Sequence, residues 1–132
     1  CLAMSWNGNV ALAASQAHAA GKPYSVTYQI PREGTLLWFD AVVIPRDAPH
    51  PEAALALLDH LSAPEVIAGV TNTVYYANAV PAANPLVDPA ILNDPGTYPP
   101  ASVQQKLYVK NDNSRVFDRA LTRAFSRLKS GT

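Results

Sequence analysis

The pattern of hydrophobic and polar residues predicts three β-strands in the first third of the chain. Residues 24–30 (YSVTYQI) place an aromatic or β-branched side chain at every second position, which is the period of a strand. Residues 35–44 (TLLWFDAVVI) form an apolar run typical of a buried strand, and residues 2–6 are a shorter candidate. Asp40 lies in the middle of the apolar run, so its ionised carboxylate needs either a partner or an open cleft.

Helical patterns occupy most of the remaining chain. Residues 10–20 are rich in alanine, and we expect the residues Asn7, Gly8 and Asn9 to form the turn and cap before them. Further helices are predicted for residues 51–61, 64–74, 88–92, 100–107 and 117–128, with residues 75–85 irregular. The helices of residues 51–61 and 64–74 each begin with a proline that suits a first turn, and Ser62 is a candidate N-cap for the second of them. Strands that alternate with helices indicate an α/β fold.

The last predicted helix is amphipathic. Its apolar positions follow a spacing of three and four residues: Phe117, Ala120, Leu121, Ala124, Phe125 and Leu128. Four arginines share the opposite face: Arg115, Arg119, Arg123 and Arg127. We interpret them as a solvated helix face and predict no nucleic-acid partner, because ten basic residues balance ten acidic ones and the isoelectric point is about 7.

Composition indicates a packed globular protein. The chain has 132 residues, of which 48% are hydrophobic and 15% charged. Cys1 is the only cysteine, and it fits a free buried thiol and half of a disulfide with an outside partner equally well. Because an apolar strand pattern is already under way at residue 1, we expect the chain to be a fragment.

The sequence contains no catalytic or metal-binding motif that we recognise. The histidines His18, His50 and His60 lack a short metal-ligand spacing, and one cysteine cannot build a zinc cluster. The motifs GxSxG, GxGxxG and the P-loop are absent. We therefore predict a protein that is not an enzyme and that needs no metal or cofactor.

Aromatic residues gather where the predicted elements end. Trp6 directly precedes a turn, Trp38 lies beside Asp40, and Tyr75 and Tyr76 follow a helix. Aromatic faces and a carboxylate suit an organic cation, because each cation–π contact contributes about 0.5–2 kcal/mol. The same pattern fits a hydrophobic core, and the residues alone favour the core.

Several longer motifs give the chain a resemblance to a known family. They are CLAMSWNGNV, YQIPREGTLLWFDAVVIP, PEAALALLDHLSAPEVIAGV, VYYANAVPAANPLV, GTYPPASVQQKL and RALTRAFSRLKSG. In this order, over residues 1–132, they resemble the putrescine/spermidine-binding proteins of bacterial polyamine transporters. The resemblance implies an α/β protein, the C-terminal part of the type II periplasmic-binding fold. Residues of about 1–30 and 86–132 would then belong to one lobe, and residues of about 31–85 to the other.

The resemblance also implies a ligand site. The tryptophan that packs on the polyamine chain corresponds to Trp6, and the aromatic residue of a later strand corresponds to Trp38. The aspartate that anchors an ammonium group corresponds to Asp40, and a further aromatic residue to Tyr76. Family members carry an aspartate where this chain has Asn9, which offers an acceptor without a charge. Losing one charge-assisted contact predicts roughly 5- to 150-fold weaker binding of a diamine, so another polyamine or an amine with one cationic end is expected.

The implied function is the capture of a polyamine in the periplasm for an ABC permease of the inner membrane. The alternative is a ligand-sensing domain of the same fold that binds another small amine or an amino-acid-like solute. An enzyme built on this fold is a weaker alternative, since no nucleophile–base pair is evident. Because the piece would complete neither lobe, its apolar strand edges would be exposed, and we expect it to self-associate.

Overall fold

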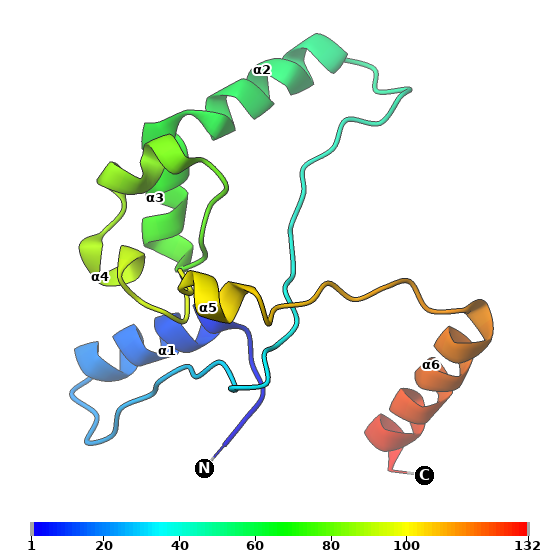
Figure 1. Ribbon diagram of the computed structural model, residues 1–132. Coiled ribbons are helices and arrows are strands. Elements are labelled where there is room, and N and C mark those ends of the chain that lie inside the picture. Colours follow the sequence, from blue (N-terminus) through cyan, green and yellow to red (C-terminus); the bar gives the residue numbers. More distant parts are fainter. Residues whose placement is uncertain (1, 132) are drawn as a thin grey trace.

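The computed structural model describes residues 2–131, and the predictions for Cys1 lie outside them. The chain is helical (Figure 1). In order, its elements are α1 (Asn7–Ala19), α2 (Pro51–Ser62), α3 (Pro64–Val74), the 3-10 helix η1 (Pro81–Leu86), α4 (Pro89–Leu92), α5 (Ala101–Gln104) and α6 (Arg115–Ser130). A helix is therefore present at each predicted place, but the one predicted for residues 100–107 extends only over Ala101–Gln104. The 3-10 helix η1 is an additional turn at the end of a segment predicted to be irregular.

The observed N-terminal boundaries of α1 and α3 differ from those predicted from the sequence. The helix α1 begins at Asn7 after Trp6, with no side-chain cap, so residues 7–9 are its first turn and not a preceding loop. The N-cap of α3 is Ala63, because Ser62 is still the last residue of α2. Two caps are made by side chains: Asp88 accepts from the amide of Ala90 in α4, and Ser114 accepts from the amide of Phe117 in α6.

The three predicted strands are not formed within residues 2–131. Residues 2–6, 24–30 and 35–44 are mostly extended, but their only pairing is an isolated parallel bridge between Leu36 and Tyr108. A strand needs the backbone of a neighbouring strand for its hydrogen bonds, and the described part of the chain supplies one such neighbour over a single residue pair. The α/β class predicted from the sequence is therefore not confirmed by these residues alone.

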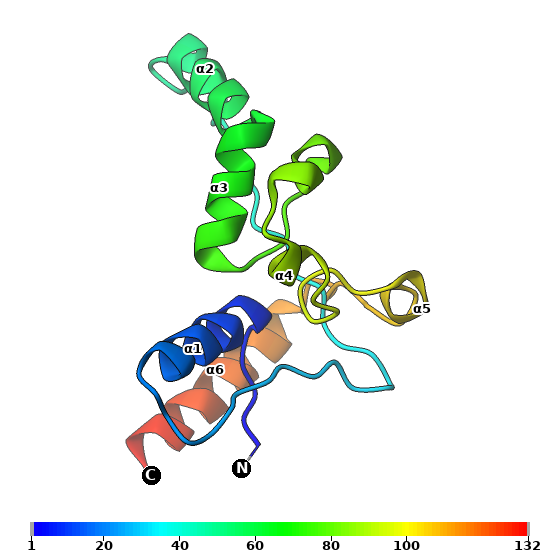
Figure 2. The same ribbon diagram turned by 90° about the vertical axis from the view of Figure 1, so that its left-hand side faces the viewer.

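A small core holds the centre of the molecule together. Its buried apolar residues come from α3, η1, the residue that follows η1, and α4: Ala68, Ala83, Val87 and Ile91. Thr71 of α3 is 1% exposed, and its hydroxyl accepts a hydrogen bond from the side-chain amide of Asn78. The helix α3 packs on η1 and also contacts α2 and α1, and it lies between those two helices in both views (Figures 1 and 2). This core therefore positions the N-terminal end of α1.

Much apolar surface is exposed outside that core. The accessible surface is 10810 Å² for 14.1 kDa, whereas a compact monomer of this mass exposes roughly 6,700 Å². The prediction that residues 35–44 are buried is wrong, since Trp38, Phe39 and Val43 are 59%, 69% and 76% exposed. No second layer covers this segment within the described residues, which is the physical reason. The helix α6 is also exposed on both faces and lies apart from the other helices in Figure 1.

The length and hydropathy of a helix decide whether it could cross a membrane. Within residues 2–131, no single helix is long and apolar enough to cross a membrane. The helices α2 and α3 pass that test of length and composition only together, as a pair bent by 69°.

Candidate functional site

A hollow of about 410 Å³ lies between the start of α1 and the extended residues 35–40. This volume falls within the usual range of small-molecule sites, about 300–1,000 Å³. Its lining is mainly aromatic and aliphatic: Trp6, Asn7, Tyr28, Ile30, Thr35, Leu36, Leu37, Trp38, Asp40, Tyr76, Gly96, Pro99 and Leu107. Trp6 and Trp38 are about half exposed, so the hollow is open to solvent.

One side of the hollow, which we call the α1–Tyr76 wall, consists of residues 6–9 and 75–78. The Tyr76 hydroxyl donates to the side-chain oxygen of Asn9 over 3.4 Å. Gly8 is buried beneath the Tyr76 ring. The Tyr75 hydroxyl lies 3.3 Å from the hydroxyl of Ser15, about two turns further along α1 than Gly8. The two tyrosines therefore fasten the end of α3 to α1.

The backbone of residues 75–78 is fixed to the core from the other direction. Tyr75 caps α3 in a left-handed conformation with φ 61°, which is unusual for a residue with a side chain. Asn78 then forms three hydrogen bonds: its side-chain amide donates to Thr71 and Tyr98, and its side-chain oxygen accepts from the amide of Val80. These contacts hold the α1–Tyr76 wall at its present place.

The opposite side, which we call the Trp38 wall, consists of residues 35–40. The indole N–H of Trp38 donates to Asp40 Oδ1 over 3.2 Å. The Trp38 ring lies beside the Trp6 ring in the lining of the hollow, with ring centroids 5.9 Å apart and planes tilted by 56°. That separation suits an edge-to-face aromatic contact. Asp40 carries the only carboxylate among the described residues that line the hollow.

The Trp38 wall is attached to the rest of the molecule through residues 106–108. The amide of Leu37 donates to the Tyr108 carbonyl over 2.8 Å, and the amide of Tyr108 donates to the Thr35 carbonyl over 3.2 Å. Gly34 has φ 98°, and a β-carbon there would collide with the Lys106 backbone. This turn therefore requires glycine, both for its backbone angle and for the close approach.

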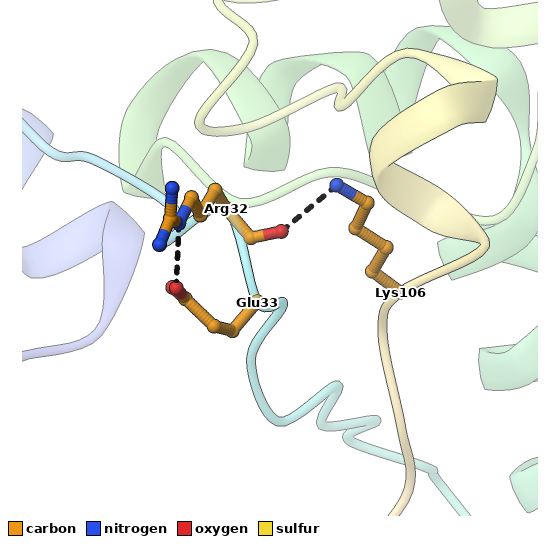
Figure 3. Close-up of polar contacts among 3 residues, drawn as sticks. All are labelled: Arg32, Glu33 and Lys106. Atoms are coloured by element: carbon orange, nitrogen blue, oxygen red, sulfur yellow. Dashed lines mark hydrogen bonds and ion pairs between the residues drawn. The ribbon is translucent and has the colours of Figure 1, made fainter.

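Three charged residues lie at the same turn: Arg32, Glu33 and Lys106 (Figure 3). The Lys106 ammonium donates to the Arg32 carbonyl over 2.8 Å, and Arg32 Nε pairs with Glu33 Oε1 over 2.8 Å. The hydrogen bond from Arg32 lowers the pKa of Glu33 below its ordinary value of 4.5, helped by the backbone amide of Glu33 and, least, by the Lys106 charge. The Arg32 and Glu33 side chains are 92% and 69% exposed, so this pair contributes little to stability.

The structure brings the five residues predicted for the site close to one another. Trp6, Trp38, Asp40 and Tyr76 line the hollow, and Asn9 is the hydrogen-bond partner of Tyr76. Sequence reasoning did not include Tyr28, Gly96 or the role of Gly8. The alternation of residues 24–30 contains the signal for Tyr28, because its alternate side chains share one face. No sequence pattern pointed to Gly96, whose neighbour is the Tyr28 ring.

The chemistry of the hollow suits an organic cation. It combines one carboxylate, aromatic faces and apolar walls, and no lysine or arginine lies among its described lining residues. No group of three histidine, cysteine or acidic residues that could hold a metal ion occurs among residues 2–131. The three histidines are exposed, as expected for residues of helix surfaces and a loop.

Comparison with known proteins identifies relatives over almost the whole chain. Residues 2–99 match the family model described as bacterial extracellular solute-binding protein. The chain is 43% identical over 131 residues to the putrescine-binding periplasmic protein SpuD of Pseudomonas aeruginosa, covering 99% of this chain and 36% of that relative. It is 39% identical over 131 residues to the putrescine-binding periplasmic protein PotF of Escherichia coli, covering 99% of this chain and 35% of that relative.

A further relative is named for two polyamines. The spermidine/putrescine-binding periplasmic protein of Salmonella typhimurium is 37% identical over 111 residues, covering 84% of this chain and 30% of the relative. The chain thus spans about a third of the length of the curated relatives that it matches.

Proposed function

The chain belongs to the bacterial extracellular solute-binding proteins, and we propose that it is the C-terminal part of a periplasmic protein that captures a polyamine for an ABC importer. The protein would deliver its ligand to a permease in the inner membrane. The proposal rests on relatives named for putrescine and spermidine and on the chemistry of the hollow. The observation that carries it is one carboxylate, Asp40, in a hollow whose two tryptophan rings lie 5.9 Å apart.

In this proposal, the two tryptophans receive the methylene chain and Asp40 receives one ammonium group. Each cation–π contact contributes about 0.5–2 kcal/mol. A hydrogen bond to a charged group contributes about 1.5–3 kcal/mol. Together these contacts would make the binding free energy of a protonated amine clearly more favourable than that of a neutral solute of the same size.

Asn9, the hydrogen-bond partner of Tyr76, supplies no charge to the Tyr76 side of the hollow. Its side-chain oxygen already accepts from Tyr76, and a side-chain amide has no charge. We propose that the ligand presents its essential cation to Asp40, and that the Asn9–Tyr76 end accepts a neutral or more weakly bound group. Replacing Asn9 by aspartate would then strengthen the binding of diamines more than that of monoamines.

Calorimetric titration of the full protein that contains residues 1–132 tests the function. We expect putrescine or spermidine to bind, with a monoamine of the same chain length as the matched control for the second ammonium group. Binding weaker than about millimolar for every polyamine would contradict the proposal. So would an Asp40→Ala variant with the affinity of the unchanged protein.

The exposed extended segments support a larger α/β assembly. We propose that residues 24–30 and 35–44 become strands of a type II periplasmic-binding fold when the remaining two-thirds of the protein supplies their neighbours. In that fold, residues of about 1–30 and 86–132 would belong to one lobe and residues of about 31–85 to the other.

The isolated 132-residue chain offers a separate test of this assembly. Without those neighbours it would cover its apolar surface by self-association. Sedimentation at tens of micromolar should then show dimers or larger species, and a strictly monomeric chain would contradict this part.

A further inference from the structure

Gly8 is buried in the first turn of α1, directly against the ring of Tyr76. A β-carbon at Gly8 would lie 2.6 Å from both Cδ2 and Cζ of that ring, and the nearest atom of all would be the ring Cε2. Real β-carbons essentially never approach other atoms so closely. The space that a side chain would need at Gly8 is therefore filled by Tyr76.

The backbone at Gly8 does not itself require glycine. The described glycines with positive φ are Gly21, Gly34 and Gly131, and Gly8 is not among them. Within a helix, glycine is less stable than alanine by roughly 0.5–1 kcal/mol. Position 8 of α1 therefore carries a residue type that is unfavourable in a helix. The close approach of the Tyr76 ring explains why a glycine stands there.

We propose that Gly8 is a positioning residue for the ligand site: the missing β-carbon lets the Tyr76 ring lie directly against the first turn of α1, where it lines the hollow. The inference rests on the proposed function for its ligand, but the contact itself does not. The hydroxyl of the same ring reaches Asn9, the next residue of α1. Gly8 thus lies against the ring carbons of Tyr76, and Asn9 binds its hydroxyl.

The backbone that carries the ring has little freedom to move away from an added methyl group. Asn78, two residues later, is tied to Thr71, Tyr98 and Val80 by hydrogen bonds. Tyr75, one residue earlier, is held in the left-handed cap of α3. A methyl group at Gly8 would therefore rotate the Tyr76 side chain out of its place or displace α1.

A double-mutant cycle tests the contact in the full protein. Gly8→Ala alone should lower the melting temperature. In a Tyr76→Ala background the same substitution should raise it by about 1–4 °C, because only the helix preference of alanine remains. Gly69→Ala, in the middle of α3 with nothing within 4 Å of its added β-carbon, is the matched control and should raise the melting temperature in both backgrounds.

A binding arm tests the link to the ligand. With Tyr76 present, Gly8→Ala should weaken putrescine binding by about 2- to 30-fold, the value of one cation–π contact. With Tyr76→Ala it should change the affinity less than twofold. Gly69→Ala should leave the affinity unchanged in both backgrounds.

The outcomes separate this inference from the proposed function. If putrescine and spermidine do not bind the unchanged protein, the proposed function fails, while the reversal of the melting-temperature shift still decides whether Gly8 positions the ring. Equal destabilisation by Gly8→Ala in both backgrounds, or an unfolded double variant, would overturn the inference. So would a reversal of stability accompanied by an unchanged affinity in a protein that binds putrescine.

Discussion

The two walls of the hollow are held in place by very different means. The α1–Tyr76 wall rests on the buried core, and its hydrogen bonds link residues up to 67 positions apart in the sequence. The Trp38 wall is attached through the isolated bridge between Leu36 and Tyr108 and the turn at Gly34. Beyond Asp40 the chain continues as an extended segment that runs apart from the helices to the start of α2 (Figure 1).

The difference shows which contacts these 132 residues provide by themselves. Helices form within one segment, so a core of α3, η1 and α4 assembles from neighbours in the sequence. A strand depends on residues that can be distant in the chain. The α1–Tyr76 wall rests on that core, while the Trp38 wall exposes Trp38 and Phe39.

The largest expected difference between the walls is in stability. Ile91 is 7% exposed in the core beneath the α1–Tyr76 wall, so Ile91→Ala should lower the free energy of unfolding by about 2–5 kcal/mol. Val43→Ala, at a residue 76% exposed just beyond the Trp38 wall, should change it by less than about 0.5 kcal/mol. Urea unfolding of the 132-residue chain measures both values. Equal losses would mean that the two regions are packed alike.

A smaller effect should loosen the Trp38 wall alone. Gly34→Ala introduces backbone strain of about 1–3 kcal/mol and a collision with the Lys106 backbone. Hydrogen exchange at the amides of Leu37 and Tyr108, which form the bridge, should then accelerate.

Gly21→Ala is the matched control, because Gly21 also has a positive φ but nothing lies within 4 Å of an added β-carbon. It should leave both amides unchanged. Faster exchange in both variants would show that general destabilisation, and not the turn at Gly34, controls the bridge.

The smallest expected effect concerns the exposed charges on that turn. Arg32→Ala should raise the pKa of Glu33 towards 4.5, and Lys106→Ala should raise it less, because the Lys106 charge is the weakest cause of the shift. A lowered carboxyl pKa stabilises the folded chain above about pH 4.5, and this contribution is lost as the pH falls through the lowered pKa. A nuclear magnetic resonance titration measures both variants. An unchanged pKa in Arg32→Ala would show that the ion pair does not form in solution.

Sequence patterns predicted local structure well and long-range structure poorly. Pro51 and Pro64 each begin a helix where the sequence placed one, because a proline in the first turn acts on its own segment. The apolar run at residues 35–44 was predicted to be a buried strand, but burial depends on a covering layer that the pattern itself cannot supply. The α/β class and the division into lobes remain predictions for the same reason.

The candidate site was predicted in its chemistry but not in its packing. Trp6 and Tyr76 were singled out beside element ends, and Trp38 and Asp40 within an apolar strand. The resemblance then decided between a ligand site and a core. The role of Gly8 could not be predicted, because its burial against Tyr76 joins residues 68 positions apart.

The central claim is that Asp40 is the acid that receives a cationic amine, and one calorimetric comparison tests it most directly. Putrescine is titrated into the full protein carrying Asp40→Asn or Glu33→Gln, each of which removes one carboxylate charge with little change in size. The account predicts that Asp40→Asn weakens binding by roughly 10- to 150-fold, the value of a charge-assisted hydrogen bond. Glu33 lies outside the hollow, so Glu33→Gln should change the affinity less than twofold. Equal affinities in the two variants would contradict the account.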